Sequence, residues 1–328
     1  MIAVTGATGL LGNAIIRKLV DAGENFIAIK RKGSDTSLLT DIASKISWRE
    51  ADVTDTVALD EALQGVTCVI HSAGLVSFNS RDKKRLYDVN VMGTRNLINA
   101  SLRRNIRRFV HVSSVAALSR PKDVIQIDEE QKWIESPLNT TYAESKYLSE
   151  LEVMRGHEEG LNTVIVNPSV ILGPGDWNRS SAKFFRYIWN GNSLYTDGSM
   201  NYVDANDVAS IIIALINTPF NGERFIVNAG SIPYKLLFEK IAENFNKHPP
   251  SIKAEKKVLS FFAGVERLRS FITGSEPLVT KETAQLANTT IVYSNEKVKN
   301  KLNFIFQSID DTLKQCCEYY ILQGNGKK

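Results

Sequence analysis

A glycine-rich turn between a short apolar run and a helical pattern constrains the fold of this chain more than any other feature. Residues 2–4 are apolar, residues 5–12 read TGATGLLG, and the apolar-periodic stretch that follows ends near Gly23. A strand, glycine turn and helix in this order present backbone N–H groups at a helix N-terminus, where they bind phosphate. The spacing departs by one residue from G-x-G-x-x-G, so a turn that binds nothing is the alternative. The residues expected at the phosphate site are Gly6, Thr8, Gly9, Leu10, Leu11 and Gly12.

Further short apolar runs alternate with helical patterns along the chain. They cover residues 26–29, 47–51, 68–71, 109–113 and 163–167. This alternation predicts a parallel sheet with helices on both faces and ligands at the carboxyl ends of the strands. After Pro168 the rhythm becomes irregular, although residues 224–228 resemble a returning strand. We therefore expect an α/β protein with a Rossmann-type doubly wound sheet from residues 1–172 and 201–230. Residues 173–200 and 231–328 are expected to form a smaller, discontinuous substrate-binding lobe.

Tyr142 and Lys146 are candidates for proton transfer because residues four apart on a helix lie on one face. A lysine ammonium one turn from a phenol stabilises the phenolate and so lowers the pKa of the tyrosine. Lowering that pKa by about three units takes about 4 kcal/mol of differential interaction. The spacing alone often arises by chance on an exposed helix, so the surrounding motifs decide its meaning.

Seven segments, taken in order, resemble the extended short-chain dehydrogenase/reductase family, also called the NAD-dependent epimerase/dehydratase superfamily. They are the turn at 5–12, Asp52-Val53, His71-Ser72-Ala73-Gly74, Asn90 to Thr94, Val112-Ser113-Ser114, Tyr142 with Lys146, and Asn167-Pro168-Ser169. The later segments GPGD at 173–176 and YVDANDVA at 202–209 extend the resemblance. The pattern is most similar to dihydroflavonol-reductase-like and hydroxysteroid-dehydrogenase-like members.

The resemblance implies how this chain would hold a dinucleotide. Asp52 would hydrogen-bond the adenine amino group, and Val53 would add a backbone contact. Small residues after the fourth predicted strand would leave room for the cofactor. The further expected contacts are Ser72, Ala73, Gly74, Tyr142, Lys146, Pro168 and Ser169. His71 and His111 are expected to be packed core histidines rather than ligands.

The end of the second predicted strand bears on cofactor choice. An acid there would bind the ribose hydroxyls of NAD, but Lys30, Arg31 and Lys32 follow instead. A cation favours the 2′-phosphate of NADP, and Arg31 matches the position of such an arginine in dihydroflavonol-reductase-like relatives. We expect NADP, bound by Lys30 and Arg31. The alternative is that these cations form a solvated strand end and the cofactor is NAD.

For catalysis, the resemblance implies that Ser114 hydrogen-bonds the substrate oxygen and Tyr142 donates the proton. Lys146 would hold the nicotinamide ribose, and Asn90 would steady the active-site backbone and water chain. Val115 follows Ser114 where sugar dehydratases carry an Asp-Glu pair, which disfavours dehydration. Position 200 is a methionine where sugar epimerases usually carry an arginine, which weakens a nucleotide-sugar substrate. Other cations that could serve a diphosphate are Arg179, Arg186 and Arg224.

An apolar stripe at helical spacing runs from residue 258 to residue 272, with cations at both ends. Most such stripes belong to a core, but a cap over an apolar substrate pocket or contact with a membrane surface are alternatives. Residues 277–282, 293–294 and 301–304 resemble C-terminal parts of the same reductase-like and dehydrogenase-like members. Together these segments favour a reductase.

Composition excludes several other classes of protein. With 43% apolar and 23% charged residues, the chain is expected to be ordered. The basic run at 103–108 indicates a solvated helix end rather than a nucleic-acid site. Three cysteines cannot build a disulfide framework, and no metal site is expected. The first strand follows Met1 directly and no apolar run is long enough to span a bilayer, so a cytoplasmic location and no transmembrane segment are expected.

These observations predict an NADP-preferring oxidoreductase acting on the carbonyl or secondary alcohol of a small, fairly apolar molecule. A homodimer through the helical segments at 81–104 and 142–158 is expected. Two alternatives stay open: a nucleotide-sugar epimerase with tightly bound NAD(P), and a regulator that binds NAD(P) without turnover. The sequence does not name the substrate or the direction of the reaction.

Overall fold

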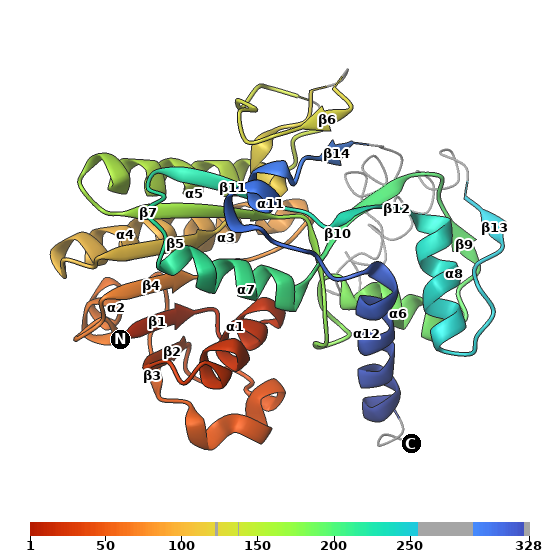
Figure 1. Cartoon of the computed structure of the whole chain (residues 1–328), viewed down its shortest axis with the longest axis horizontal. Coiled ribbons are helices and arrows are strands. Elements are labelled where there is room, and N and C mark those ends of the chain that lie inside the picture. The colour runs from red at the N-terminus through yellow and green to blue at the C-terminus, as the bar shows by residue number, and fades with distance from the viewer. Residues whose placement is uncertain (122–123, 137, 255–290, 325–328) are drawn as a thin grey trace.

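A seven-stranded parallel sheet lies at the centre of the computed structural model, which describes residues 1–121, 124–136, 138–254 and 291–324. The strand order is β11-β7-β5-β4-β1-β2-β3 (Figure 1). The strands are β1 (Ile2–Thr5), β2 (Phe26–Lys30), β3 (Trp48–Glu50), β4 (Cys68–His71), β5 (Arg108–Val112), β7 (Thr163–Pro168) and β11 (Glu223–Val227). The predicted doubly wound α/β fold is confirmed.

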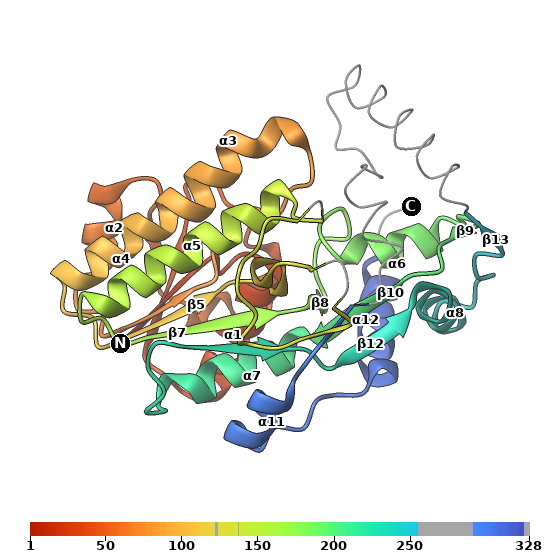
Figure 2. The same ribbon diagram turned by 90° about the horizontal axis from the view of Figure 1, so that it is seen from above.

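Helices cover both faces of this sheet, which explains why its inner strands β1, β4, β5 and β7 are buried at every residue. Figures 1 and 2 show α1 (Leu10–Asp21) and α7 (Ala205–Ile216) on one face and α4 (Gly93–Arg103) and α5 (Thr141–Glu158) on the other. The helix α2 (Thr56–Ala62) packs with α4. Alternate side chains of β1 enter the two cores: Ile2 and Val4 pack toward α1 and α7, and Ala3 packs toward α2 and α4.

The strand order reverses at β1, which places a crevice at one edge of the sheet. Strands β2 and β4 both pair with β1 in parallel, so the chain leaves β1 in one direction and returns on the other side. All carboxyl ends meet at the same edge, and ligands bind outside that edge where the order reverses. The glycine turn lies there, between β1 and α1.

A second core lies beyond the sheet. It gathers α6 (Ala182–Trp189), α8 (Tyr234–Asn244) and α12 (Ile309–Gly324), which stand together at one end of the molecule (Figure 1). A three-stranded sheet joins them, with β10 between β8 and β12. The three strands are β8 (Val170–Leu172), β10 (Ser199–Asp204) and β12 (Gly230–Pro233). Shorter pairs are β9 (Leu194–Tyr195) with β13 (Ile252–Lys253) and β6 (Gln126–Ile127) with β14 (Val292–Tyr293).

Two expectations differ from the structure. The helix α11 (Glu296–Leu302), expected in the second lobe, packs against the first core through the buried Val298. The basic run at 103–108 follows the end of α4 with Arg103 and Arg107 exposed, as expected, but its last residue, Arg108, is 5% exposed at the start of β5. The Arg108 guanidinium donates to the carbonyls of Leu215 and Phe220 at 2.6 Å each, so it satisfies backbone oxygens at the end of α7 and just after it.

The helical segment expected at 81–104 forms, but it is not one regular α-helix. It begins with the short turn η2 (Ser80–Asp82) and α3 (Lys83–Leu86) and continues through the π-helical turn η3 (Tyr87–Met92) into α4. Such wide turns are often found at functional sites. The other short helices are η1 (Ser37–Lys45) and η4 (Val115–Leu118).

The apolar stripe at 258–272 and the segment at 277–282 lie outside the described residues. Within the described part of the chain, no helix combines the length and apolarity needed to cross a membrane. Cys68, Cys316 and Cys317 are all buried as free thiols.

Candidate active site

The turn after β1 is built around two glycines that approach other backbone closely. Gly6 has a φ of +71°, and a Cβ placed on it would lie 2.6 Å from the backbone N of Ala73. A Cβ on Gly12 would lie 2.0 Å from the carbonyl oxygen of Gly6. A side chain at position 6 would therefore push the turn away from the loop after β4, and a side chain at position 12 would push α1 away from the turn.

The N-terminus of α1 is open to an anion. Gly9 caps the helix without a side-chain hydrogen bond, and no acidic residue lies in the first turn. The first N–H groups of a helix have no partner inside the helix, and the helix dipole favours negative charge there. The buried Leu11 belongs to the first core, so it would offer only its backbone to a ligand. This donor set fits the pyrophosphate of a dinucleotide.

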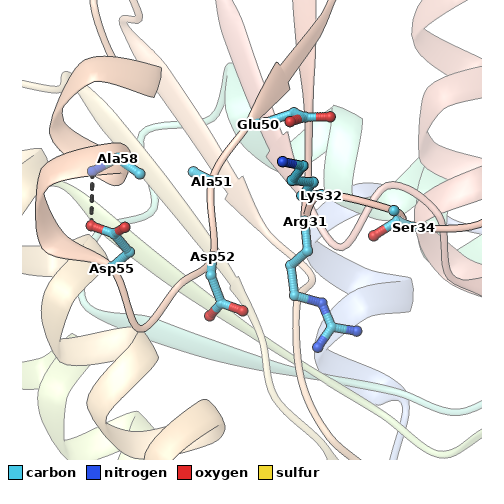
Figure 3. A pocket seen from close by; sticks show the side chains of 9 residues that line it. Arg31, Lys32, Ser34, Glu50, Ala51, Asp52, Asp55 and Ala58 are labelled. Carbon is cyan, nitrogen blue, oxygen red and sulfur yellow. Dashed lines mark hydrogen bonds between the residues drawn. The ribbon is translucent and has the colours of Figure 1, made fainter.

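A pocket of about 500 Å³ lies at the ends of β2 and β3 and is lined in part by Arg31 and Asp52. Figure 3 shows both side chains extending the same way from adjacent strands. Among the described residues, the Arg31 guanidinium has no carboxylate partner. Lys30 does not line this pocket; its Nζ lies 3.3 Å from Glu50, which does line it, and 5.9 Å from the ring centre of Trp48. Lys30 and Arg31, which were expected to bind the cofactor together, therefore lie in different surroundings.

Asp52 is held in an orientation suited to its expected role at the adenine. Its Oδ1 accepts hydrogen bonds from the backbone N–H and the hydroxyl of Thr54, at 2.9 and 2.7 Å. Both bonds are on Oδ1, which leaves Oδ2 without a partner in the described structure. Val53 is buried against Gly93, and its carbonyl oxygen accepts from Asn96.

The loop after β4 is tied to β1 by a buried histidine. His71 has no exposed surface, and its ring nitrogens lie 2.8 Å from the Thr5 hydroxyl and 3.0 Å from the Thr94 hydroxyl. Burial and the nearby Lys146 lower its pKa to about 3, so it stays neutral. The prediction of a packed core histidine is confirmed for His71, and His111 is buried in the same way.

Asn90 fixes the same loop from the π-helical turn. Its amide accepts from the N–H of Leu75 at 2.7 Å and donates to the carbonyl of Leu75 and the hydroxyl of Ser145 at 3.0 Å each. One side chain thus joins the loop after β4 to α5. A Cβ on Gly74 would lie 3.4 Å from Asn90 Oδ1 and 3.7 Å from Lys146 Nζ, so Gly74 keeps the loop close to the lysine.

Ser114, Tyr142 and Lys146 come from β5 and α5, at the carboxyl edge of the sheet. Ser114 caps η4, and its Oγ accepts from the N–H of Ala116 at 3.2 Å. This leaves the hydroxyl proton free, and the Ser114 side chain lies near enough to the Tyr142 phenol to lower its pKa. The ring of Tyr142 also meets Phe78 edge-on, with ring centres 5.8 Å apart.

The pKa of Tyr142 differs from the expectation. Burial raises it above its ordinary value, while the Ser114 side chain and the charge of Arg120 lower it. Burial prevails, so the predicted lowering by Lys146 is wrong for this structure. The Lys146 ammonium instead donates to the carbonyl of Val112 at 2.9 Å, and burial lowers its pKa to about 8.

Two polar side chains behind this site were missed in the sequence. Glu150, one turn beyond Lys146, has no exposed surface. The Asn167 amide donates to Glu150 Oε1 at 2.6 Å and to the carbonyl of Ser114 at 3.0 Å. The spacing of Tyr142, Lys146 and Glu150 at every fourth residue was the available signal. At the end of β7, Pro168 and the buried Ser169 follow Asn167.

Arg120 lies near three tyrosines, Tyr142, Tyr234 and Tyr293. Its Nε donates to the Tyr293 hydroxyl at 3.1 Å, and its charge lowers the pKa of both Tyr142 and Tyr234. Met200 is 2% exposed within the second core. The three arginines considered for a diphosphate already have protein partners. Arg179 pairs with Asp176, Arg186 bonds Asn178, and Arg224 lies 3.6 Å from Glu150.

Comparisons with known proteins agree with this geometry. The model of the NAD dependent epimerase/dehydratase family matches residues 2–230. Sterol demethylase protein B of Methylococcus capsulatus is 33% identical over 229 residues, which are 68% of this chain and 68% of that protein. A putative dihydroflavonol 4-reductase of Synechocystis sp. is 26% identical over 327 residues, which are 98% of this chain and 94% of that protein.

Among solved structures, the crystal structure of gox2253 has a TM-score of 0.84 at 28% identity and covers 99% of this chain and 98% of its own. Family model, relatives and fold therefore agree with the resemblance found in the sequence. The chain belongs to the NAD-dependent epimerase/dehydratase family of extended short-chain dehydrogenase/reductases and is an NAD(P)-dependent enzyme of that type.

Proposed function

We propose that the protein is an NADP-preferring oxidoreductase that interconverts a carbonyl and a secondary alcohol, with Ser114, Tyr142 and Lys146 as its catalytic set. One observation carries the proposal: the Ser114 side chain lies near enough to the Tyr142 phenol to lower its pKa, with Lys146 one turn further along α5. A hydroxyl pair at the carboxyl edge of such a sheet can bind one substrate oxygen from two sides.

In carbonyl reduction, the Ser114 hydroxyl polarises the substrate oxygen and the Tyr142 hydroxyl donates its proton to that oxygen. The raised pKa of Tyr142 suits this role, because the phenol is protonated at neutral pH. Lys146 would donate hydrogen bonds to the nicotinamide ribose of a bound cofactor. When bound, the cofactor supplies the hydride that the reduction consumes. Asn90 keeps the loop after β4 in place through Leu75.

Arg31 supports the preference for NADP. The guanidinium lines the pocket after β2 with no ion-pair partner among the described residues, and Arg31 and Lys32 stand directly after β2 where an acid would bind ribose hydroxyls. The remainder of the dinucleotide would be held by the glycine turn after β1, by Asp52 and Val53, and by the loop from Ser72 to Gly74. The names of the relatives, a sterol demethylase protein and a dihydroflavonol 4-reductase, support a small, fairly apolar substrate with a ring alcohol or ketone.

The test is net cofactor oxidation by the purified protein. NADPH and NADH are offered with a panel of ketones and aldehydes, alongside nucleotide sugars, and Tyr142→Phe serves as the control variant. We expect NADPH consumption with at least one carbonyl compound and a loss of roughly 10²–10⁴-fold in the variant. Binding of NADPH by the variant is measured as well, to separate lost chemistry from lost cofactor.

Other outcomes of this assay favour the alternatives. Interconversion of nucleotide sugars without net cofactor change would identify an epimerase, and tight NAD(P) binding without turnover would identify a regulator. The buried Met200 and the paired Arg224 argue against a diphosphate site at those positions. A homodimer through α4 and α5 and a cytoplasmic location stay predictions, and light scattering of the purified protein tests the first.

A further inference from the structure

A buried acid lies behind the catalytic residues and has no role in the reaction described above. We propose that Glu150 is a positioning residue, which keeps Lys146 positively charged and, through Asn167, holds Ser114 in place. This inference rests on the proposed function, because it assigns Lys146 and Ser114 their roles. Three observations carry it: the position of Glu150 on α5, its charge, and its hydrogen bond from Asn167.

The first observation is the position of Glu150 on α5. Tyr142, Lys146 and Glu150 follow one another at four-residue intervals along α5, so they lie along one face of the helix. That face meets the sheet, where Lys146 is 5% exposed and Glu150 is 0% exposed. An acid is almost never fully buried unless it is paired.

The second observation is the effect of the Glu150 charge on Lys146. Burial lowers the pKa of Lys146 to about 8, and the charge of Glu150 opposes this. The other titratable groups facing Lys146 from the sheet are His71 and His111, whose pKa values burial lowers, so both are neutral. Glu150 therefore supplies the negative charge that holds a proton on the buried amine.

Arg224 completes this charge arrangement from β11. Its Nη2 lies 3.6 Å from Glu150 Oε2, and its side chain is 20% exposed. Burial raises the pKa of Glu150, whereas Arg224 is the main influence that lowers it. The arginine thus favours the ionised carboxylate that Lys146 needs. Removing Arg224 should act on Lys146 in the same direction as removing the charge of Glu150.

The third observation is a pair of hydrogen bonds from Asn167 that connects Glu150 to Ser114. Asn167 donates from one nitrogen to Glu150 Oε1 at 2.6 Å and to the carbonyl of Ser114 at 3.0 Å. The carboxylate fixes the orientation of this amide, and the amide holds the backbone of Ser114 at the end of β5. One buried acid therefore connects two members of the catalytic set.

The experiment compares Glu150→Gln, Glu150→Leu and Arg224→Gln with the wild-type protein. Glutamine keeps an acceptor for Asn167 but removes the charge, whereas leucine removes both. Glu152→Gln is the matched control, because Glu152 lies on the same helix but pairs with Arg95 and Arg155. The readouts are the pH profile of kcat/KM for carbonyl reduction and the titration of the Lys146 amine by NMR of lysine-labelled protein. Lys146→Arg identifies the resonance.

In Glu150→Gln and Arg224→Gln, we expect the Lys146 titration and the alkaline limb of the profile to move to lower pH by about one unit. Glu150→Gln should retain most of the wild-type maximal rate. Glu150→Leu should show the same shift and also a lower maximal rate, because Asn167 no longer holds Ser114. The control should change neither readout.

An unchanged Lys146 titration in Glu150→Gln, in a folded protein, would overturn the charge role. Equal maximal rates in the leucine and glutamine variants would overturn the link to Ser114. If the wild-type protein reduced no carbonyl compound, the proposed function would fail, but the NMR titration would still decide whether Glu150 controls the lysine.

Discussion

Replacing Arg31 with glutamine should weaken the binding of NADPH and leave that of NADH nearly unchanged. The guanidinium lines the pocket after β2 together with Glu50, Asp52 and Asp55, and among the described residues it forms an ion pair with none of them. A hydrogen bond to a charged group contributes about 1.5–3 kcal/mol. Arg31 is exposed, so water and salt screen it and the lower end applies. About 1.5 kcal/mol corresponds to a roughly tenfold loss of NADPH affinity.

Lys30→Gln is the matched control, because it removes a neighbouring cation whose Nζ already lies 3.3 Å from Glu50. An exposed ion pair of this kind contributes about 0–1 kcal/mol, so the loss should stay below about fivefold. Dissociation constants of NADPH and NADH are measured by protein fluorescence for both variants at low and high salt.

Salt should reduce the difference between wild type and Arg31→Gln, since added ions screen the contact with the phosphate. An unchanged ratio of NADPH to NADH affinity in Arg31→Gln would refute the reasoning. So would an equal loss in Lys30→Gln, because the two cations would then act as one diffuse charge rather than as one specific contact.

Two further predictions concern the site and the turn. Arg120→Met removes a charge that lowers the pKa of Tyr142, so the pH at which alcohol oxidation becomes fast should rise. A pH-rate profile identical to wild type would contradict this. Gly12→Ala should cost about 3 kcal/mol of unfolding free energy, because its Cβ would lie 2.0 Å from a carbonyl oxygen. Gly23→Ala should cost only about 1 kcal/mol, since its φ of +66° is strained but no atom lies within 4 Å. Equal losses in chemical denaturation would show that the contact at Gly12 is relieved.

The inner strands of the main sheet could be predicted because they are buried on both faces. The predicted strand at 68–71 matches β4 at both ends, and the other strands of the main sheet begin and end within two residues of their predicted positions. A continuous apolar run is typical of such strands. The location of the site at the carboxyl edge of the sheet could be predicted from the parallel arrangement of the strands alone.

Other features depend on packing that a sequence does not display. Lys30 and Arg31 are adjacent, and only the pairing of β2 with β3 sends Lys30 toward Glu50 and Arg31 into the pocket. The pKa of Tyr142 was predicted with the wrong sign, because spacing shows a neighbouring lysine but not the burial that outweighs it. Arg108 was expected to be solvated because basic runs normally are, yet its guanidinium donates to the carbonyls of Leu215 and Phe220.

The π-helical turn from Tyr87 to Met92 makes this part of the chain sensitive to changes in length. It accommodates one residue more than an α-helical turn of the same height, and Asn90 lies within it. Deleting one residue there would restore the ordinary α-helical pitch and improve local hydrogen bonding. The same deletion would rotate α3 against α4 by about 100° and turn Asn90 away from Leu75. Gaining helical regularity and keeping the loop after β4 in place are therefore incompatible at this point in the chain.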